Sequence, residues 1–271
     1  MFDLIRSHLV RLWKSPVYWL ALLVMLPYGL GLSNSAVGDI QSGTAGPGPW
    51  GQCLFGPSLL MGMILAAVFA LFFGAEYADG TMRSKLVAGH GRAGVYLATL
   101  AASLLAALAL YLTSLLAWAP RLGWMLQNFP APETKTLALC LAGTALLLAA
   151  YCSVCVMLCM LIQRRSLLAV ALILLMAGLF AASLQVQDAW ETATAGGMQL
   201  MIDEAGQQQW VFHEPGQAGA LTAFLYDALP GCQAYRYMAL DAAPRMLVCS
   251  AAMTCLTTAL GLVLFRRKDV R

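Results

Sequence analysis

Residues 73–100 read FGAEYADGTMRSKLVAGHGRAGVYLATL, a polar segment between two long apolar runs. It holds six charged or histidine side chains, at Glu76, Asp79, Arg83, Lys85, His90 and Arg92. Because no apolar face of this segment is wide enough to build a core, the pattern predicts a short surface helix. Thr81 can cap the start of this helix, and the region Gly89 to Gly91 can end it. We therefore expect the segment to face a partner.

The composition of the chain is that of a protein embedded in a membrane. Of its 271 residues, 61% are hydrophobic and 11% are charged, whereas a soluble domain has about 25% charged residues. A helix needs about 20 apolar residues to cross the hydrocarbon core of a bilayer. Six runs qualify, at approximately residues 17–32, 54–74, 93–119, 136–162, 166–184 and 246–265. We therefore expect an all-α integral membrane protein, with residues 1–271 forming a single transmembrane domain of six spans.

The six runs contain no Asp, Glu, Lys, Arg or His. Ionisable groups at membrane depth usually mark a proton relay or an ion site, so their absence from these runs disfavours a proton-coupled transporter. If the N-terminus is cytoplasmic, 12 of the 16 Lys and Arg residues lie inside, and four, Arg121, Lys135, Arg236 and Arg245, lie outside. This bias predicts a plasma-membrane protein with both termini in the cytoplasm. The basic residues are divided by the membrane, so no nucleic-acid binding is expected.

The N-terminal third has two further features. Apolar residues recur at near-helical spacing over residues 1–15, which predicts an interfacial amphipathic helix leading into the first span. The alternative is a frayed start that only carries topogenic charge. Pro27, Gly29 and Gly31 predict that the first span kinks or ends early, and the Gly- and Pro-rich stretch up to Gly51 is expected to be an external loop with little regular structure.

The eight cysteines do not form the pattern of a disulfide scaffold in a chain this long and apolar. Cys152, Cys155 and Cys159 share one helix face, but structural zinc takes four Cys or His ligands, so we expect these thiols to pack between helices. Cys53 and Cys232 are both expected outside, where oxidising surroundings permit a bridge without requiring one.

Residues 185–245 form an acidic external segment before the last span. Residues 198–202 and 207–213 can form a small hairpin. Residues 221–229 are predicted to form an apolar helix that is too short to span and is stopped by Pro230. Two roles remain open for this segment. It is either a lid over an exit path or a structural cap that holds spans five and six apart, and the aromatic candidates for a lid are Trp210, Phe212, Phe224 and Tyr226.

The polar segment resembles the coupling helix that joins the second and third membrane helices in bacterial type-2 ABC exporter permeases. The resemblance rests on Glu76-Tyr77, on residues 79–85 reading DGTMRSK, on residues 89–92 reading GHGR, and on Tyr96-Leu97. Residues 265–269, FRRKD, are similar to the short basic tail of such permeases. The resemblance implies that an ATPase couples through Glu76, Asp79, Thr81, Arg83, Lys85, His90 and Arg92. It also implies two copies of a separate ABC ATPase subunit and a second permease subunit, of the same or a related chain.

The sequence contains no GxSxG, HExxH or Walker A motif, so we expect no enzymatic activity and no catalytic, cofactor-binding or metal-binding residue on this chain. ATP and magnesium would be bound by the partner ATPase. The first hypothesis is therefore the permease subunit of an ATP-driven exporter of amphipathic, peptide or lipid-like cargo. The alternative is a non-transporting sensor or immunity subunit that binds an extracellular peptide and signals through the same cytoplasmic helix.

Overall fold

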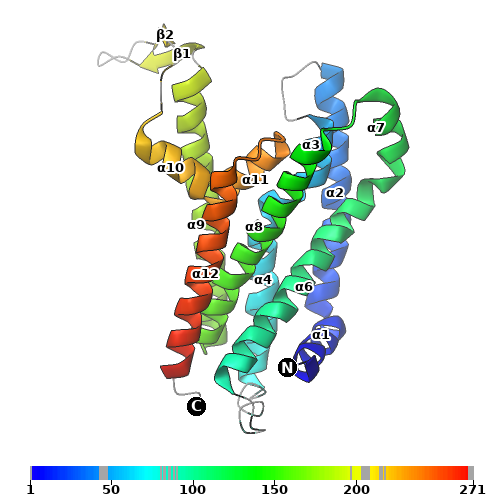
Figure 1. The fold of residues 1–271 in the computed structure, drawn as a ribbon, viewed down its shortest axis with the longest axis vertical. Coiled ribbons are helices and arrows are strands. Elements are labelled where there is room, and N and C mark those ends of the chain that lie inside the picture. Colours follow the sequence, from blue (N-terminus) through cyan, green and yellow to red (C-terminus); the bar gives the residue numbers. More distant parts are fainter. Residues whose placement is uncertain are drawn as a thin grey trace.

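The computed structural model describes residues 2–42, 48–79, 81, 84, 87, 89, 91–195, 197–202, 208–213, 216 and 218–267. Within this part of the chain, six helical stretches are long and apolar enough to cross a membrane (Figure 1). They cover Pro16–Gly38, Pro49–Glu76, Arg92–Asn128, Thr134–Leu161, Arg165–Thr194 and Pro244–Arg267. Each overlaps one of the predicted runs, so the number of spans is confirmed, and the protein is a multi-pass membrane protein.

The elements follow one another as a helical bundle with one small hairpin. In chain order they are α1 (Phe2–Lys14), α2 (Pro16–Ser42), α3 (Pro49–Phe55), α4 (Pro57–Ala78), α6 (Arg92–Trp118), η1 (Ala119–Arg121), α7 (Leu122–Asn128), α8 (Thr134–Leu161), α9 (Arg165–Ala195), β1 (Gly197–Ile202), β2 (Gln208–His213), α10 (Ala220–Ala228), α11 (Pro230–Met238) and α12 (Pro244–Arg267). Both termini lie at one end of the bundle, called here the terminal end, and the hairpin lies at the other (Figure 1).

Helix α8 forms the centre of the bundle. It packs against α4, α6 and α12, and 67% of its most apolar stretch is buried, compared with 11% in α12. Small residues allow this close packing. A Cβ atom on Gly143 of α8 would lie 2.3 Å from the hydroxyl oxygen of Tyr237, so α11 rests directly on α8 at this glycine.

The cysteines of α8 lie at these helix contacts, as predicted. Cys152, Cys155 and Cys159 are buried. The thiol of Cys152 donates to the carbonyl of Ser103 on α6 at 3.5 Å, and that of Cys159 donates to the carbonyl of Phe69 on α4 at 3.9 Å. The structure thus places these thiols as small packing groups between spans. The bridge that the sequence permits between Cys53 and Cys232 is not formed in the structure, where both are free thiols.

The first span does not end early, which corrects the expectation from its proline and glycines. Helix α2 runs without interruption through Pro27 to Ser42, and the chain is helical again from Pro49. Membrane helices tolerate proline because neighbouring groups satisfy the freed backbone. Gly29 has a packing role, since a Cβ atom there would lie 2.3 Å from the carbonyl oxygen of Ser114 on α6. The glycine lets α2 and α6 approach closely.

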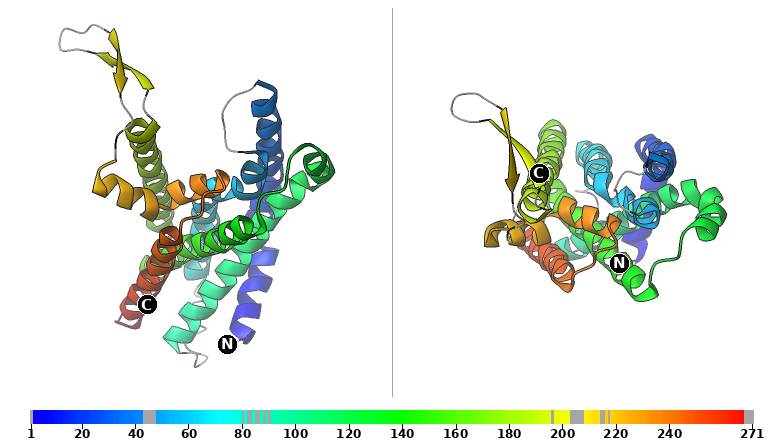
Figure 2. Two further views of the ribbon diagram at one scale, coloured as in Figure 1. Left: turned by 45° about the horizontal axis from the view of Figure 1, so that its top comes forward. Right: turned by 90° about the horizontal axis from the view of Figure 1, so that it is seen from above.

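The predicted hairpin and the short apolar helix before the last span are both present. Strands β1 and β2 pair antiparallel, from Gly197 opposite His213 to Ile202 opposite Gln208. Helix α9 extends beyond its predicted end at residue 184 to Ala195. Pro230 ends the apolar helix α10, as expected, and also occupies the first turn of α11. Helices α10 and α11 lie across α9 short of its hairpin-bearing end and beside the start of α12 (Figure 2).

Candidate functional site

The polar segment lies at the terminal end of the bundle, between α4 and α6 (Figure 1). The structure describes four of the seven residues predicted to couple to an ATPase: Glu76, Asp79, Thr81 and Arg92. The other three, Arg83, Lys85 and His90, lie outside the described residues. The described side chains of the site therefore lie mainly at the two ends of the segment, where it leaves α4 and enters α6.

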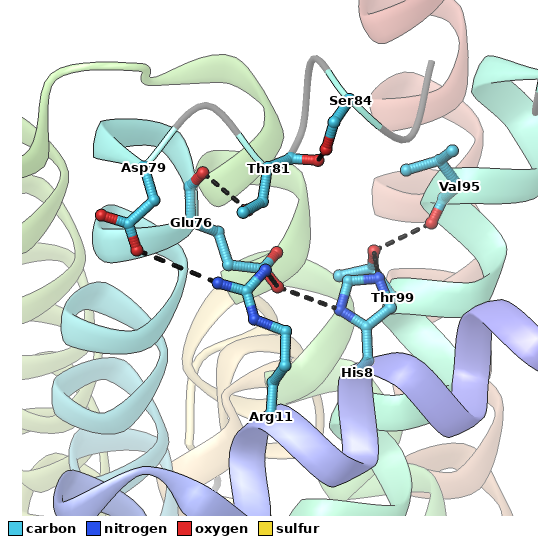
Figure 3. Close-up of polar contacts among 8 residues, drawn as sticks. All are labelled: His8, Arg11, Glu76, Asp79, Thr81, Ser84, Val95 and Thr99. Carbon is cyan, nitrogen blue, oxygen red and sulfur yellow. Dashed lines mark hydrogen bonds and ion pairs between the residues drawn. The ribbon is translucent and has the colours of Figure 1, made fainter. Parts of the chain in front are cut away.

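The carboxylate of Glu76 is buried in the last turn of α4, with 1% of its side chain exposed. Two cationic or hydrogen-bonding groups from α1 reach the same oxygen (Figure 3). Arg11 Nη1 donates to Glu76 Oε1 at 3.2 Å, and His8 Nδ1 lies 3.5 Å from that atom. A buried carboxylate loses several kcal/mol of hydration, so such partners are what keep it in the interior.

The position of α1 follows from its amphipathic sequence. Leu4, His8 and Leu12 are spaced four residues apart, lie on one face of the helix and are buried. This face packs against α6. Because Arg11 lies three residues after His8, the same docking carries both side chains to Glu76. A helix is present at Phe2–Lys14, and its buried face contacts the neighbouring spans.

His8 connects three helices through its two ring nitrogens. Its Nε2 lies 3.2 Å from the hydroxyl oxygen of Thr99 on α6. The Thr99 hydroxyl donates to the carbonyl of Val95 at 2.8 Å, so its oxygen accepts from His8 Nε2. The other ring nitrogen faces Glu76 on α4. The imidazole therefore bridges α1, α4 and α6 (Figure 3).

The residues just after α4 continue this polar group toward the surface. Asp79 is 63% exposed, and its Oδ2 lies 3.9 Å from Arg11 Nη2, a contact weakened by solvent. The hydroxyl of Thr81, predicted to cap the next helix, donates to the carbonyl of Glu76 at 2.9 Å and so satisfies the end of α4. Gly89 has a φ of 86°, the left-handed conformation expected of a glycine that ends a helix.

Arg92 begins α6 and links it to the last helix. Its Nη1 donates to the carbonyl oxygens of Arg266 at 3.0 Å and Phe265 at 3.4 Å, in the last turn of α12. The final carbonyls of a helix have no partner within the helix, and a guanidinium is well suited to bind them. The two ends of the polar segment are thus attached to different elements, Glu76 to α1 and Arg92 to α12.

Reasoning from the sequence missed three residues of this site: His8, Arg11 and Thr99. The sequence contains a signal for one of them, His8. His8 falls on the apolar stripe of α1 between Leu4 and Leu12, where an ionisable side chain requires a buried partner. The identity of that partner depends on how α1 docks, which spacing within one helix does not determine.

The four aromatic residues proposed for an external lid have different surroundings. Trp210 and Phe212 lie in β2, opposite Leu200 and Met198 of β1. Phe224 on α10 is 61% exposed. Only 9% of Tyr226 is exposed.

Tyr226 fixes α10 in place. Its ring stacks on Trp190 of α9, with 4.6 Å between ring centroids and an angle of 7° between ring planes. The guanidinium of Arg236 lies 5.1 Å from the centroid of the same ring. Burial raises the pKa of Tyr226 to about 12, although Arg236 nearby acts in the opposite direction.

Polar contacts attach α11 to the elements around it. Arg236 forms ion pairs with Asp227 and with Asp241, the latter at 2.8 Å. Gln233 is 1% exposed and donates to the carbonyls of Asp227 and Met246 at 2.7 and 3.2 Å. Its Oε1 accepts from the hydroxyl of Ser250 on α12 at 2.5 Å. These contacts attach α11 to α10, to the loop before α12 and to α12 itself.

The described part of the chain contains no group of three or more His, Cys, Asp or Glu side chains that could hold a metal ion.

Comparison with protein-family models and with curated proteins gives no relative for this site. No protein-family model matches the chain, and no curated protein matches its sequence significantly.

Proposed function

We propose that this protein is the membrane-spanning permease subunit of an ATP-driven exporter of the type-2 ABC kind, in the bacterial cytoplasmic membrane. The observation that carries the proposal is the buried carboxylate of Glu76, held by Arg11 and His8 of α1 at the terminal end of the bundle. Glu76 lies where the polar segment leaves α4, and Arg92 lies where the segment enters α6.

The attachments of these two residues suit a segment that transmits force. A displacement of the segment would act on α4 and α1 through Glu76, and on α6 and α12 through Arg92. Four helices would then move together from one small surface. The carboxylate of the ion pair between Arg11 and Glu76 is buried, so water competes for this contact less than for exposed single charges.

The source of energy in this proposal is a separate ABC ATPase, present in two copies, which binds ATP and magnesium and docks on residues 76–92. The terminal end is then cytoplasmic, in agreement with the bias of basic residues. A second permease subunit completes the complex. The apolar stretches of α9 and α12, of which 22% and 11% are buried, leave broad apolar surface for that subunit or for lipid.

The cargo is proposed to be amphipathic, peptide or lipid-like, because the spans offer apolar and small side chains. The cap formed by α10 and α11 would keep the outer ends of α9 and α12 at a set spacing while cargo passes between subunits.

The test is purification of the full chain from its native membrane with its partners, followed by reconstitution into vesicles. Co-elution with an ATPase, together with ATP-dependent movement of an amphipathic dye or peptide, is the expected result. Glu76→Ala should retain the ATPase and lose transport, while Lys135→Ala, an exposed residue at the other end of the bundle, should retain both. Co-elution without any cargo movement, but with a response to an external peptide, would favour the sensor. Failure to co-elute with any ATPase would overturn the proposal.

A further inference from the structure

An apolar groove opens at the terminal end where α1 meets α2 and α6. Its volume is about 410 Å³, and Leu9, Trp13, Lys14, Tyr18, Leu105 and Ala109 are among its lining residues. Grooves of this size accommodate a ligand of small-molecule dimensions. A second cavity of about 590 Å³ extends the apolar surface along α2, between Pro16 and Leu26, and includes Thr113 of α6.

The two cavities meet at the turn between α1 and α2. Trp13 lines the first and Trp19 the second, and their ring centroids are 4.7 Å apart. The indole nitrogen of Trp19 donates to the carbonyl of Trp13 at 2.7 Å, which fixes the turn. Both side chains remain about half exposed, at 58% and 48%. Tryptophan is enriched at the boundary between a bilayer and water, so two tryptophans at one turn are typical of headgroup level.

One hydrogen bond within the protein fixes the spacing of two walls of the groove, α2 and α6. The hydroxyl of Tyr18 donates to the carbonyl of Ala106 on α6 at 3.1 Å. Ala106 and Ala109 on α6 present only methyl groups to the space between the helices. The groove is therefore preformed, and its depth depends on these two small residues.

One charge lines the groove. Lys14, the last residue of α1, is exposed, and none of the described residues is placed to form an ion pair or hydrogen bond with its ammonium group. Among the described residues, no acidic side chain lines the groove. An apolar channel with an unpaired cation at its headgroup-level mouth is complementary to a ligand that carries a hydrocarbon chain and a negative headgroup.

We propose that this groove binds one anionic phospholipid, with an acyl chain between α1 and α6 and its phosphate at Lys14. The lipid completes the apolar surroundings of α1, the helix that carries Arg11 and His8 to Glu76. The proposal does not depend on transport, because it concerns only this turn and its place at the membrane boundary.

The test is native mass spectrometry of the full chain after equilibration in micelles that contain phosphatidylglycerol and phosphatidylcholine in equal amounts. The expected result is preferential retention of one phosphatidylglycerol. Lys14→Gln should lower that retention about fivefold, the factor that one basic residue near an anionic surface contributes. The matched control is Lys135→Gln, which removes an exposed lysine at the other end of the bundle and should change nothing. Equal retention of the two lipids by the unmodified chain would overturn the proposal.

A second variant tests the groove itself. Ala109→Trp should fill the channel and abolish retention of phosphatidylglycerol, whereas Leu108→Trp, on an exposed position of α6 outside the groove lining, should not. Thermal unfolding of each purified variant shows whether the bundle is intact. Undiminished retention by a folded Ala109→Trp variant would mean that the lipid binds elsewhere, and the proposal would fail.

Discussion

Arg11 and Glu76 are 65 residues apart in the sequence and form an ion pair of 3.2 Å that joins α1 to α4. The carboxylate is 1% exposed and the arginine 33%. Solvent therefore reaches one partner and hardly the other, so the loss of the arginine leaves a buried charge that water cannot stabilise. The pair attaches α1 to the bundle together with the contacts of His8 to Glu76 and Thr99.

Arg11→Ala is expected to destabilise the protein by about 1–3 kcal/mol. Removing one partner of a fully buried pair costs about 3–5 kcal/mol, and the partial exposure of Arg11 lowers this value. The measurement is the midpoint of thermal unfolding of the purified chain in detergent. Arg6→Ala is the control, because Arg6 is exposed on the same helix. Equal midpoints for the two variants would show that the ion pair contributes nothing.

Combining Arg11→Ala with Glu76→Ala should destabilise less than the sum of the two single changes. The double variant leaves no unpaired buried charge, so the two effects are not additive. A double-mutant cycle of unfolding free energies measures the difference. Strict additivity would contradict direct coupling between the two side chains.

His8→Leu is expected to destabilise more than Thr99→Val. The first change removes the group that faces Glu76 and the donor to Thr99, whereas the second removes one hydroxyl, worth about 1 kcal/mol. Unfolding midpoints of the two variants, measured at one pH, give the comparison. A larger effect for Thr99→Val would mean that the imidazole is not the bridging group.

Gly29→Ala should destabilise the contact between α2 and α6 by about 1–3 kcal/mol, because the added methyl group meets a backbone carbonyl oxygen that cannot easily move. Gly31→Ala is the matched control on the same helix. A Cβ atom there meets nothing within 4 Å, and alanine favours helix, so this variant should be neutral or more stable. The midpoints of thermal unfolding of the two variants in detergent give the comparison. A stable Gly29→Ala variant would argue against close packing at this position.

Arg92→Ala tests the proposed transmission of force. It removes the bonds to the carbonyls of Arg266 and Phe265, so α6 and α12 should no longer move as a unit. We expect co-purification with the ATPase to persist while transport per ATP hydrolysed falls at least tenfold. Arg92→Lys, which keeps the charge but not the paired donors, should be intermediate. Normal transport by Arg92→Ala would exclude a coupling role for these bonds.

The six spans were predictable because their signal is local: a run of apolar residues must be long enough to cross a bilayer, and helices are the way to satisfy its backbone. The hairpin was predictable for a similar reason, as its strands flank a short polar turn. The length of α2 was not. Proline and glycine usually mark the end of a helix in water, but the contact of Gly29 with Ser114 shows that here they belong to a packed interface.

The candidate site was only half predictable. The polar residues between α4 and α6 stand out in a chain so poor in charge, and they alone identified Glu76 and Arg92. Their partners, Arg11 and the last carbonyls of α12, come from the two ends of the chain. Contacts between residues so far apart in the sequence depend on how the helices pack. The periodicity of residues within one segment does not predict that packing.

The docking of α1 on Glu76 also bears on how the protein is made. Helix α1 is synthesised before α4, and the carboxylate that holds it lies in that later span, 65 residues after Arg11. Until that span is inserted, the amphipathic helix has no protein surface to cover and must wait at the face of the membrane. Docking of α1 at the terminal end therefore has to follow the insertion of α4, the second of the six spans, which is made after it.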